Sequence, residues 1–273
     1  MPLIEQMPEL PEVESIKRFL SPVFIGQKLV KYYINDERTN RFNSANPKNL
    51  GVLLDVTRKG KVLDFTFKNY SILFHLGMSG RVDINSKINK HTRAEFHFNK
   101  DYLVFDDIRK FGYIKITSNQ FKDEHLLKIG PDILILSIKN KRDILEKAKN
   151  SKVTIKNFLL NQKNMSGLGN IYVNEVLYKS EIHPLSSTEK LNNEHWKKIF
   201  SYSKKVLTLA IKNNGTTLDD MTYFLPNGIY GSNQNFLKIY NKNNCNKCNN
   251  IIDKLYIDNR SSYACNKCQF LIN

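Results

Sequence analysis

The chain has 273 residues, 41% of them hydrophobic, and carries 42 Lys and Arg against 26 Asp and Glu, a formal net charge of +16. This length and apolar content exclude a disordered chain and indicate about two folded domains of roughly 150 residues. The positive charge favours a polyanionic partner, because each neutralised phosphate releases a counterion; a lysine-rich compositional bias is the alternative. No apolar run approaches the roughly 18 residues of a membrane span, and the N-terminus lacks the apolar core of a signal peptide. We therefore expect a cytoplasmic protein with no membrane association.

The first predicted element is a helix over residues 9–20, in which Val13, Ile16 and Leu20 recur at helical spacing. Pro11 fits its first turn, and the glutamates there suit the positive end of a helix dipole. Short alternating runs follow, separated by Gly, Asn and Asp, a pattern typical of antiparallel strands. These runs are residues 28–34, 52–56, 61–67, 71–76, 93–98, 102–106 and 112–116. The sequence therefore predicts an antiparallel β-sandwich or barrel after the first helix.

Helical patterns return near residue 123 and dominate after residue 150, over residues 152–160, 170–179 and 193–212. The connection between the first two of the later helices contains Gly167 and Gly169, which permit a turn whose N–H groups face outward. Such a unit can clamp a phosphate, although glycine turns between packed helices are more often purely structural. Residues 213–235, rich in Gly, Asn and Thr, predict a mobile connection. We place the domains at 8–140, 150–235 and 240–273.

All four cysteines lie near the C-terminus as Cys245-x2-Cys248 and Cys265-x2-Cys268. This spacing is typical of a zinc ion held by four thiolates, and a reducing compartment argues against disulfides. Four thiolates leave no open coordination position, so we expect one structural Zn²⁺. Arg260 lies between the two pairs and could reach a phosphate, though an isolated arginine is more often simply solvated.

Two further motifs place unusual side chains at strand ends. In His75-Leu76-Gly77-Met78-Ser79-Gly80, the methionine lies between glycines. A core methionine is the commoner interpretation, and a wedge between base steps is the alternative. In Asp107-Ile108-Arg109-Lys110-Phe111-Gly112, two cations precede an aromatic residue, and the aspartate could simply anchor them.

Taken together, these motifs resemble the formamidopyrimidine-DNA glycosylase family over nearly the whole chain. The shared elements are Pro8-Glu9-Leu10-Pro11-Glu12-Val13-Glu14, Lys61, 75–80, 107–112, 167–172, Gly215-Thr216-Thr217-Leu218 and the cysteine hairpin with Arg260. The related endonuclease VIII branch, which favours oxidised pyrimidines, usually has glycine where this chain has Leu10. The resemblance implies an α+β multidomain fold: an N-terminal helix plus antiparallel β-sandwich, then a helical domain (helix, two turns, helix) with a zinc-ribbon hairpin.

By this resemblance the chain is a bifunctional glycosylase and lyase that excises 8-oxoguanine and formamidopyrimidines. The amine of Pro8 would attack the sugar C1′, expel the base and form a cationic iminium, and β,δ-elimination would cut the strand. Glu9 would protonate the sugar ring oxygen, and Glu12 would support the same site. The other implied site residues are Lys61 and Arg260, which join the catalytic set, and His75, Met78, His91, Arg109, Phe111 and Asn170, which contact DNA. Met78, Arg109 and Phe111 would fill the void left by the flipped base.

This assignment requires Pro8 to be the first residue, so the resemblance implies that synthesis starts at Met7 and that Met7 is removed. Asp219 stands where some relatives carry lysine, and we assign it no catalytic role. Residues 222–235 match only the general character of the lesion-recognition loop, which leaves the preferred lesion open.

The expected partner is double-stranded DNA containing oxidised purines or abasic sites, bound by a monomer in the bacterial cytoplasm near the nucleoid. Three alternatives remain at this point. The first is a damaged-DNA-binding protein with the same scaffold and no chemistry, and the second is an oxidised-pyrimidine glycosylase of the endonuclease VIII type. The third, favoured by charge and cysteines alone, is a zinc-ribbon transcription or RNA factor.

Overall fold

The computed structural model describes residues 8–42, 45–218 and 223–273, which divide into two compact units. The first unit comprises the chain up to Lys128 together with Ile211–Gln234, and the second comprises Ile129–Ala210 and Asn235–Asn273. The segment after the last long helix thus groups with the N-terminal half of the chain. The three domains predicted from the sequence stay a prediction.

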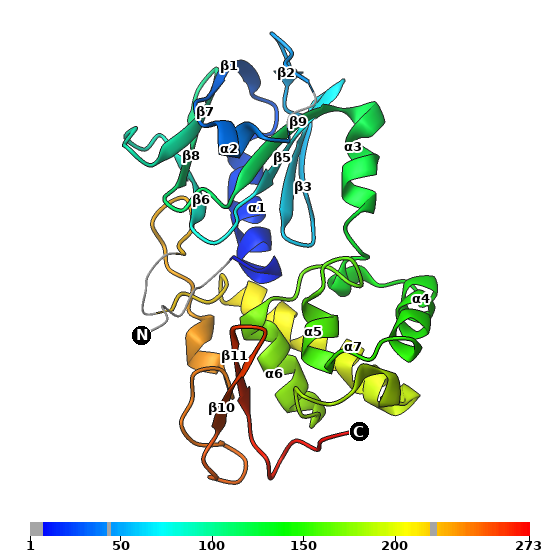
Figure 1. Ribbon diagram of the computed structural model, residues 1–273. Helices are drawn as coiled ribbons and strands as arrows, with labels where there is room; N and C mark the ends of the chain where they lie inside the picture. The colour runs from blue at the N-terminus through cyan, green and yellow to red at the C-terminus, as the bar shows by residue number, and fades with distance from the viewer. Residues whose placement is uncertain (1–7, 43–44, 219–222) are drawn as a thin grey trace. The chain divides into compact units, whose positions relative to one another are not determined.

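The first unit contains two antiparallel sheets (Figure 1). The five-stranded sheet has the order β2-β1-β7-β8-β6 and consists of β2 (Gly51–Val52), β1 (Lys28–Ile34), β7 (Thr92–Phe98), β8 (Tyr102–Asp107) and β6 (Gly80–Ile84). The four-stranded sheet has the order β3-β4-β5-β9 and consists of β3 (Asp55–Lys59), β4 (Val62–Thr66), β5 (Tyr70–His75) and β9 (Tyr113–Ser118). The predicted antiparallel β-sandwich is confirmed.

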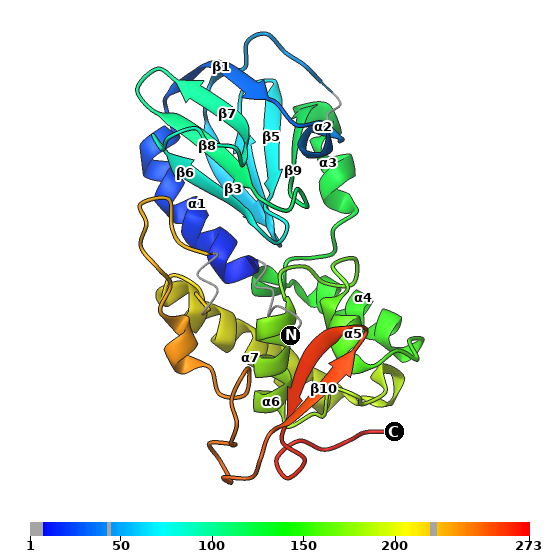
Figure 2. The same ribbon diagram turned by 60° about the vertical axis from the view of Figure 1, so that its left-hand side comes forward.

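Helix α1 (Leu10–Phe24) packs against β3 and β4, and Figure 2 shows it alongside the sheets. Its buried face consists of apolar side chains three and four residues apart, as the sequence predicts, including Val13, Ile16 and Leu20. These join the aromatic side chains of both sheets in one core, where Phe74 lies 5.0 Å from Phe65 and 5.2 Å from Phe96 between ring centroids. Burying a large apolar side chain contributes about 1.5 to 3 kcal/mol, so this core holds α1 firmly against the sheets.

Two short helices complete the first unit: α2 (Glu37–Asn40) and α3 (Asn119–Leu127). The helical pattern near residue 123 is confirmed as α3. Strand β6 is not among the predicted strands, because it lies at a sheet edge and buries only Gly80 and Val82.

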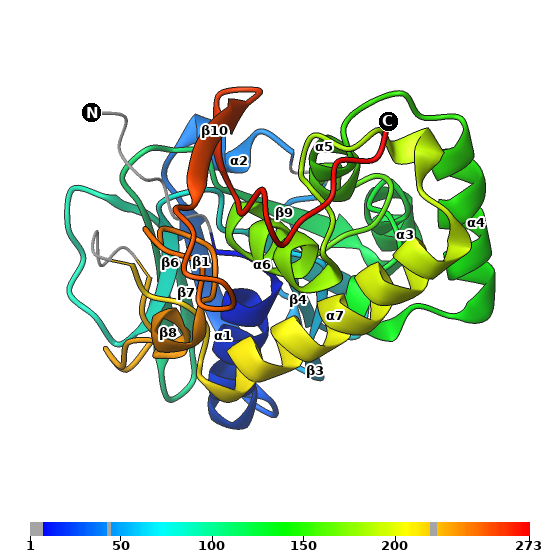
Figure 3. The same cartoon turned by 90° about the horizontal axis from the view of Figure 1, so that it is seen from below.

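The second unit is helical and ends in a two-stranded hairpin. Its elements are η1 (Ile133–Ile135), α4 (Ile138–Lys149), α5 (Ile155–Leu160), α6 (Asn170–Ser180), η2 (Thr188–Lys190), α7 (Asn193–Lys212), η3 (Asn233–Phe236), β10 (Asp253–Ile257) and β11 (Arg260–Ala264), although η3 starts and α7 ends in the first unit. The long helix α7 is yellow in Figure 3. The predicted helices 152–160, 170–179 and 193–212 correspond to α5, α6 and α7. Among the helices of the described ranges, none is long and apolar enough to cross a lipid bilayer.

Candidate active site

The N-terminal end of α1 places Pro8, Glu9 and Glu12 within two turns of one another. Helix α1 begins at Leu10, and Glu9 precedes it with an extended backbone (φ −96°, ψ −172°). Pro11 lies in the first turn, where its missing N–H costs no intrahelical hydrogen bond. Pro8 and Glu9 are buried, and the exposed fraction of Glu12 is 0%. Three of the five residues that the resemblance places in the catalytic set, Pro8, Glu9 and Glu12, therefore lie together at a buried helix start.

The carboxyl group of Glu12 joins two segments that are 204 residues apart in the sequence. Its Oε2 accepts the N–H of Glu9 at 2.9 Å, and its Oε1 accepts the N–H of Thr216 at 2.7 Å. A buried carboxyl group needs such partners, because its desolvation is otherwise uncompensated. Glu12 therefore holds the start of α1 against the turn that follows α7.

This contact explains the glycine in Gly215-Thr216-Thr217-Leu218. Gly215 has a φ of +81°, and a Cβ atom there would lie 2.8 Å from Oε1 and 2.9 Å from Cγ of Glu12. A second glycine, Gly231, packs against the carbonyl oxygen of Gly215. A Cβ atom at Gly231 would lie 2.3 Å from that oxygen, so this contact also requires glycine. The motif therefore needs glycine at position 215, because its backbone passes close to the buried Glu12 side chain.

Another glutamate of α1, Glu14, positions the β3–β4 hairpin that carries Lys61. Glu14 pairs with Nε of Arg58 at 3.0 Å and with Nζ of Lys17 at 2.9 Å. Burial raises the pKa of Glu14, but the hydrogen bonds from its cationic partners outweigh burial and leave the pKa below its ordinary value. Arg58 also donates to the carbonyl of Gly60 at 2.9 Å, and the buried Lys61 follows in the same turn. Lys61 thus lies on a hairpin tied to α1.

Two loops of the β-sandwich, residues 76–79 and 108–112, are joined by the buried carboxyl group of Asp107. Oδ1 of Asp107 accepts the hydroxyl of Ser79 at 2.6 Å, and Oδ2 accepts the N–H of Gly112 at 2.7 Å. The Ser79 hydroxyl oxygen in turn accepts the N–H of Arg109 at 2.9 Å. Asp107 is therefore an anchor for the loop, as one interpretation of the sequence expected.

The two loops also contact each other through their backbones and bring three predicted site residues together. A Cβ at Gly77 (φ +64°) would lie 2.5 Å from the backbone nitrogen of Gly112, so this approach requires glycine. The Arg109 guanidinium lies 4.9 Å from the ring centroid of Phe111, whose exposed fraction is 50%. Met78, on the facing loop, is half-buried. A cation, an aromatic ring and a thioether therefore occupy two adjoining loops.

His75 is the last residue of β5 and lies beside these loops. Its imidazole ring is uncharged and can still donate a hydrogen bond. Its ring stacks on Tyr113 with centroids 5.1 Å apart, and Nδ1 accepts the N–H of Gly77 at 3.1 Å. Burial and the neighbouring charge of Lys61 lower the pKa of His75 to about 4. The ring is therefore neutral at pH 7, and with Nδ1 as acceptor its proton lies on Nε2.

The half-buried His91 lies on the β6–β7 connection, where its carbonyl accepts the N–H of Asp107 at 2.9 Å.

In the second unit, Asn170 and Arg260 lie at the starts of neighbouring elements, α6 and β11. Nδ2 of Asn170 lies 3.4 Å from the hydroxyl oxygen of Ser261, the residue after Arg260. Oδ1 of Asn170 is buried and has no hydrogen-bond partner among the described residues. Arg260 is exposed and follows a tight turn in which Asp258 and Asn259 have φ of +46° and +59°. The second unit thus brings one amide and one guanidinium to a common surface.

Sequence reasoning missed the lysine that supports this surface. Lys156, on α5, has an exposed fraction of 0%, and its Nζ donates to the carbonyl of Ser261 at 2.7 Å and to the hydroxyl of Ser262 at 2.5 Å. Such partners are required, because an unpaired buried ammonium is strongly destabilising. In the sequence, Lys156 is visible only as a lysine between the apolar residues Ile155 and Phe158. That pattern alone does not distinguish a buried lysine from an exposed one.

The four cysteines form a cluster whose geometry fits one tetrahedral metal ion. Their Sγ atoms all lie within 4.8 Å of one another, with Cys245 and Cys268 at 3.8 Å and Cys248 and Cys265 at 3.5 Å. Zinc–thiolate bonds of about 2.3 Å place tetrahedral sulfur atoms about 3.8 Å apart. The hydroxyl of Tyr178 on α6 lies 3.1 Å from Sγ of Cys245, a contact typical of the groups that orient metal ligands.

A buried glutamate of α6 holds the segment that leads into this cluster. The carboxyl oxygens of Glu175 accept the N–H groups of three consecutive residues, Lys238, Ile239 and Tyr240, each at 2.9 Å. Burial raises the pKa of Glu175 in spite of these hydrogen bonds. The chain therefore reaches the first cysteine pair from a fixed point on α6.

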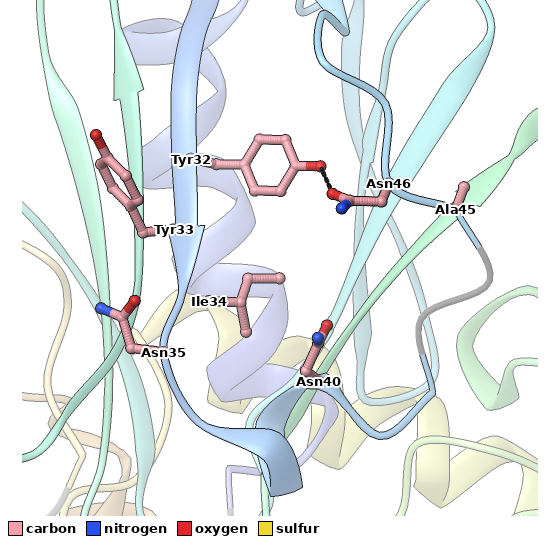
Figure 4. Close-up of a pocket in the computed structure, with 7 residues that line it drawn as sticks. All are labelled: Tyr32, Tyr33, Ile34, Asn35, Asn40, Ala45 and Asn46. Atoms are coloured by element: carbon pink, nitrogen blue, oxygen red, sulfur yellow. Dashed lines mark hydrogen bonds between the residues drawn. The ribbon is translucent and has the colours of Figure 1, made fainter.

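A separate pocket of about 560 Å³ lies beside β1 (Figure 4). Its lining residues are Tyr32, Tyr33, Ile34, Asn35, Asn40, Ala45 and Asn46. The Tyr32 hydroxyl donates to Oδ1 of Asn46 at 2.7 Å across it. None of the site residues predicted from the sequence is among these lining residues, so the pocket is distinct from the candidate active site.

Two family models match the chain. The formamidopyrimidine-DNA glycosylase N-terminal domain matches residues 7–114, and the formamidopyrimidine-DNA glycosylase H2TH domain matches residues 129–222. Among curated proteins, the formamidopyrimidine-DNA glycosylase of Listeria monocytogenes is 32% identical over 96% of this chain and 100% of its own length. The protein of that name from Legionella pneumophila strain Paris is 34% identical over 97% of this chain and 100% of its own length.

Solved structures agree with these matches. The MutM (Fpg) protein from Thermus thermophilus superposes with a TM-score of 0.87 and 30% identity, covering 96% of this chain and 98% of that one. The Lactococcus lactis Fpg, solved in complex with DNA containing Fapy-dG, superposes with a TM-score of 0.85 and 29% identity, covering 96% of this chain and 99% of that one.

Proposed function

Because the chain belongs to the formamidopyrimidine-DNA glycosylase family, we propose that it is a bifunctional DNA glycosylase and AP lyase of base excision repair. Its substrates are 8-oxoguanine and formamidopyrimidines in double-stranded DNA, together with abasic sites. The observation that carries this proposal is the buried helix start at which Glu12 holds the backbone of Glu9 beside Pro8. We also propose that the protein acts as a monomer in the bacterial cytoplasm.

The nucleophile is the secondary amine of Pro8, so the active form of the chain starts at Pro8. The match of the family model from residue 7 onward supports this start. An α-amine has a pKa of about 7.7 to 8.0, so part of it is neutral at physiological pH. Its nitrogen forms a bond to C1′ as the glycosidic bond breaks and the base leaves with a proton. The C1′–O4′ bond then breaks as a proton is delivered to O4′, and because the amine is secondary the open-chain product is a cationic iminium. The iminium acidifies the C2′ proton, and the 3′ and then the 5′ phosphate leave by elimination.

Glu9 is the proton donor to the sugar ring oxygen, and Glu12 keeps Glu9 and Pro8 in place through the backbone. Lys61, on the hairpin tied to α1, contacts the phosphate next to the reacting sugar. The neutral His75 donates to a phosphate through Nε2–H, and His91 adds a further contact. Such contacts position the duplex and carry little sequence information.

The two loops joined by Asp107 fill the space vacated by the extruded nucleotide. Met78 and Phe111 wedge between the neighbouring base pairs, and Arg109 pairs with the orphaned base. Extrusion costs a few kcal/mol, which these contacts partly offset. Support for these roles comes from the backbone approach of the two loops at Gly77, which fixes the three side chains on adjoining segments.

In the second unit, Asn170 and Arg260 contact phosphates, and one Zn²⁺ bound by the four cysteines closes the β10–β11 hairpin. The unpartnered Oδ1 of Asn170 supports a ligand at this surface, because buried polar atoms are seldom left unsatisfied. The metal has a structural role, since four thiolates fill its coordination sphere. Elemental analysis should give one zinc per chain, and Cys248→Ser should lose both the metal and DNA binding.

Borohydride trapping on DNA containing 8-oxoguanine opposite cytosine tests the nucleophile. We expect covalent trapping by the wild type and none by Pro8→Gly, whereas Pro22→Ala, a change of an exposed proline in α1, traps normally. Full trapping by Pro8→Gly, or lyase activity in protein whose intact mass includes residues 1–6, would exclude Pro8. Lesion-dependent binding without strand cleavage would instead indicate a non-catalytic damage-binding protein, and preference for an oxidised pyrimidine would indicate the endonuclease VIII type.

A further inference from the structure

The turn after α7 depends on a tyrosine side chain that the proposed chemistry does not use. Three consecutive carbonyl groups of this turn accept hydrogen bonds from residues 223–233. The pairs are Asn213 O with Ser232 N–H (2.9 Å), Asn214 O with the Tyr223 hydroxyl (2.8 Å) and Gly215 O with Asn233 N–H (3.0 Å). Backbone N–H groups donate to Asn213 O and Gly215 O, and the Ser232 hydroxyl adds a longer hydrogen bond of 3.4 Å to Asn213 O. At Asn214 O the donor is the Tyr223 hydroxyl, a side-chain group that a substitution can remove.

The turn needs these hydrogen bonds because two successive residues adopt left-handed backbone conformations. Asn214 has a φ of +57° and Gly215 a φ of +81°, and this conformation is unfavourable for a residue with a Cβ atom. It is also what directs the N–H of Thr216 onto Oε1 of Glu12 at 2.7 Å. A turn that relaxed toward ordinary φ values would withdraw that N–H from Glu12.

Tyr223 is itself held firmly. Its exposed fraction is 3%, and it belongs to the same core as Val13 and Ile16 of α1. Its carbonyl accepts the hydroxyl of Thr217 at 2.9 Å. Burial and the charge of Glu12 raise the pKa of Tyr223 well above its ordinary value, so the hydroxyl remains a neutral donor throughout the working pH range.

We propose that Tyr223 is a positioning residue for the glycosylase and lyase reactions. Its hydroxyl keeps the turn in the form that donates Thr216 N–H to Glu12, and Glu12 in turn keeps the backbone of Glu9, next to Pro8, in place. The inference rests on the proposed function, because Pro8 and Glu9 have their chemistry only there. Tyr223 acts through Glu12 and touches no reacting atom.

Tyr223→Phe tests this role, since it removes one hydroxyl and leaves the buried ring. Tyr102→Phe is the matched control, because the half-buried Tyr102 also donates to a backbone carbonyl, that of Ser86 at 3.1 Å. The first measurement is hydrogen exchange at residue resolution in the free protein with its native N-terminus. We expect the Thr216 amide to exchange about tenfold faster in Tyr223→Phe and unchanged in Tyr102→Phe, because one hydrogen bond contributes about a factor of ten.

The second measurement uses DNA. The rate of borohydride trapping on an abasic site should fall about tenfold in Tyr223→Phe, while the Kd for DNA with a stable tetrahydrofuran abasic analogue stays within twofold of the wild type. Binding of the analogue does not require the amine, so this split separates positioning of Pro8 from loss of the DNA-binding surface.

Exchange of Thr216 that is unchanged, or that rises only as much as that of amides in β4 and β5, would overturn the proposal, since the hydroxyl would then be no more than a general stabiliser. Faster exchange with an unaltered trapping rate would also overturn it. If the wild type itself traps no DNA, the proposed function fails, and the exchange measurement still decides whether Tyr223 holds Thr216 on Glu12.

Discussion

Gly215 and Gly228 have nearly the same backbone conformation, with φ of +81° and +78°, but very different surroundings. A Cβ at Gly215 would meet Glu12, whereas a Cβ at Gly228 would have nothing within 4 Å. Gly228→Ala should therefore lose about 1 to 2 kcal/mol of unfolding free energy from backbone strain alone. Gly215→Ala should lose at least about 1 kcal/mol more and abolish trapping. Urea unfolding checks both, and equal losses would show that Glu12 can move aside.

The lowered pKa of His75 predicts how stability depends on pH. The group has a pKa of about 4 when folded and an ordinary value of 6.5, so the unfolded chain takes up the proton first as the pH falls. The stability associated with the neutral ring is thus fully present above about pH 6.5 and lost as the pH falls through 4. Between pH 7 and pH 4, His75→Asn should lose less unfolding free energy than the wild type, by up to about 3 kcal/mol. Parallel pH profiles in urea unfolding would contradict this.

At the scale of single residues, the sequence predicts groups whose chemistry is visible in their type and spacing. The four cysteines converge as predicted, and Met78, Arg109 and Phe111 lie on adjoining loops. Lys156 and Tyr223 could not be predicted, because their importance lies in burial and in partners distant along the chain.

The two loops joined by Asp107 give a prediction about elements. Asp107→Asn leaves an amide NH₂ facing N–H or O–H donors, so at least one of the hydrogen bonds to Ser79 and Gly112 is lost, at about 1 to 3 kcal/mol. Asp106→Asn is the matched control, because Asp106 binds Thr92 and Arg81 on the other side of the same strand. We expect comparable losses of stability but a larger loss of 8-oxoguanine excision for Asp107→Asn, measured in single turnover. Equal losses of excision would mean that the loops need not be joined.

Elements with strong periodicity were predictable, and elements that depend on tertiary contacts were not. Helices α6 and α7 follow their apolar repeats closely, since local pattern and burial agree. The composition of residues 213–235 predicted a mobile connection, yet its described residues are hydrogen-bonded at both ends, and Tyr223 and Leu225 are buried in the core. Composition could not reveal that burial, because the core around Tyr223 and Leu225 is formed by α1 and the two sheets.

For the molecule as a whole, the net charge of +16 predicts binding that weakens steeply with salt. Lys61→Ala and Arg260→Ala should each reduce the slope of log Kd against log salt by about 1, as expected for the loss of one phosphate contact. Lys149→Ala should not, because this exposed lysine on α4 already pairs with Glu146 at 2.7 Å. Fluorescence anisotropy with duplex DNA measures the slopes; a similar decrease for Lys149 would indicate general electrostatic attraction without specific phosphate contacts.

The organisation of the whole chain was only partly visible in the sequence. A sandwich followed by a helical part and a cysteine hairpin could be predicted from successive periodicities and cysteine spacing. The return of Ile211–Gln234 to the first unit could not, because it depends on single contacts such as Glu12 with Thr216.

The hydrogen bonds that tie residues 213–217 to residues 232–234 also bear on how this protein can evolve. Asn213 with Ser232, Gly215 with Asn233 and Thr217 with Gln234 clamp both ends of the intervening segment. Doubling the length of a clamped loop costs only about 0.6 kcal/mol. Insertions that preserve Tyr223 and the closing residues can therefore accumulate without disturbing Glu12. The segment between the clamps can therefore change in length while the helix start that carries Pro8 remains constant.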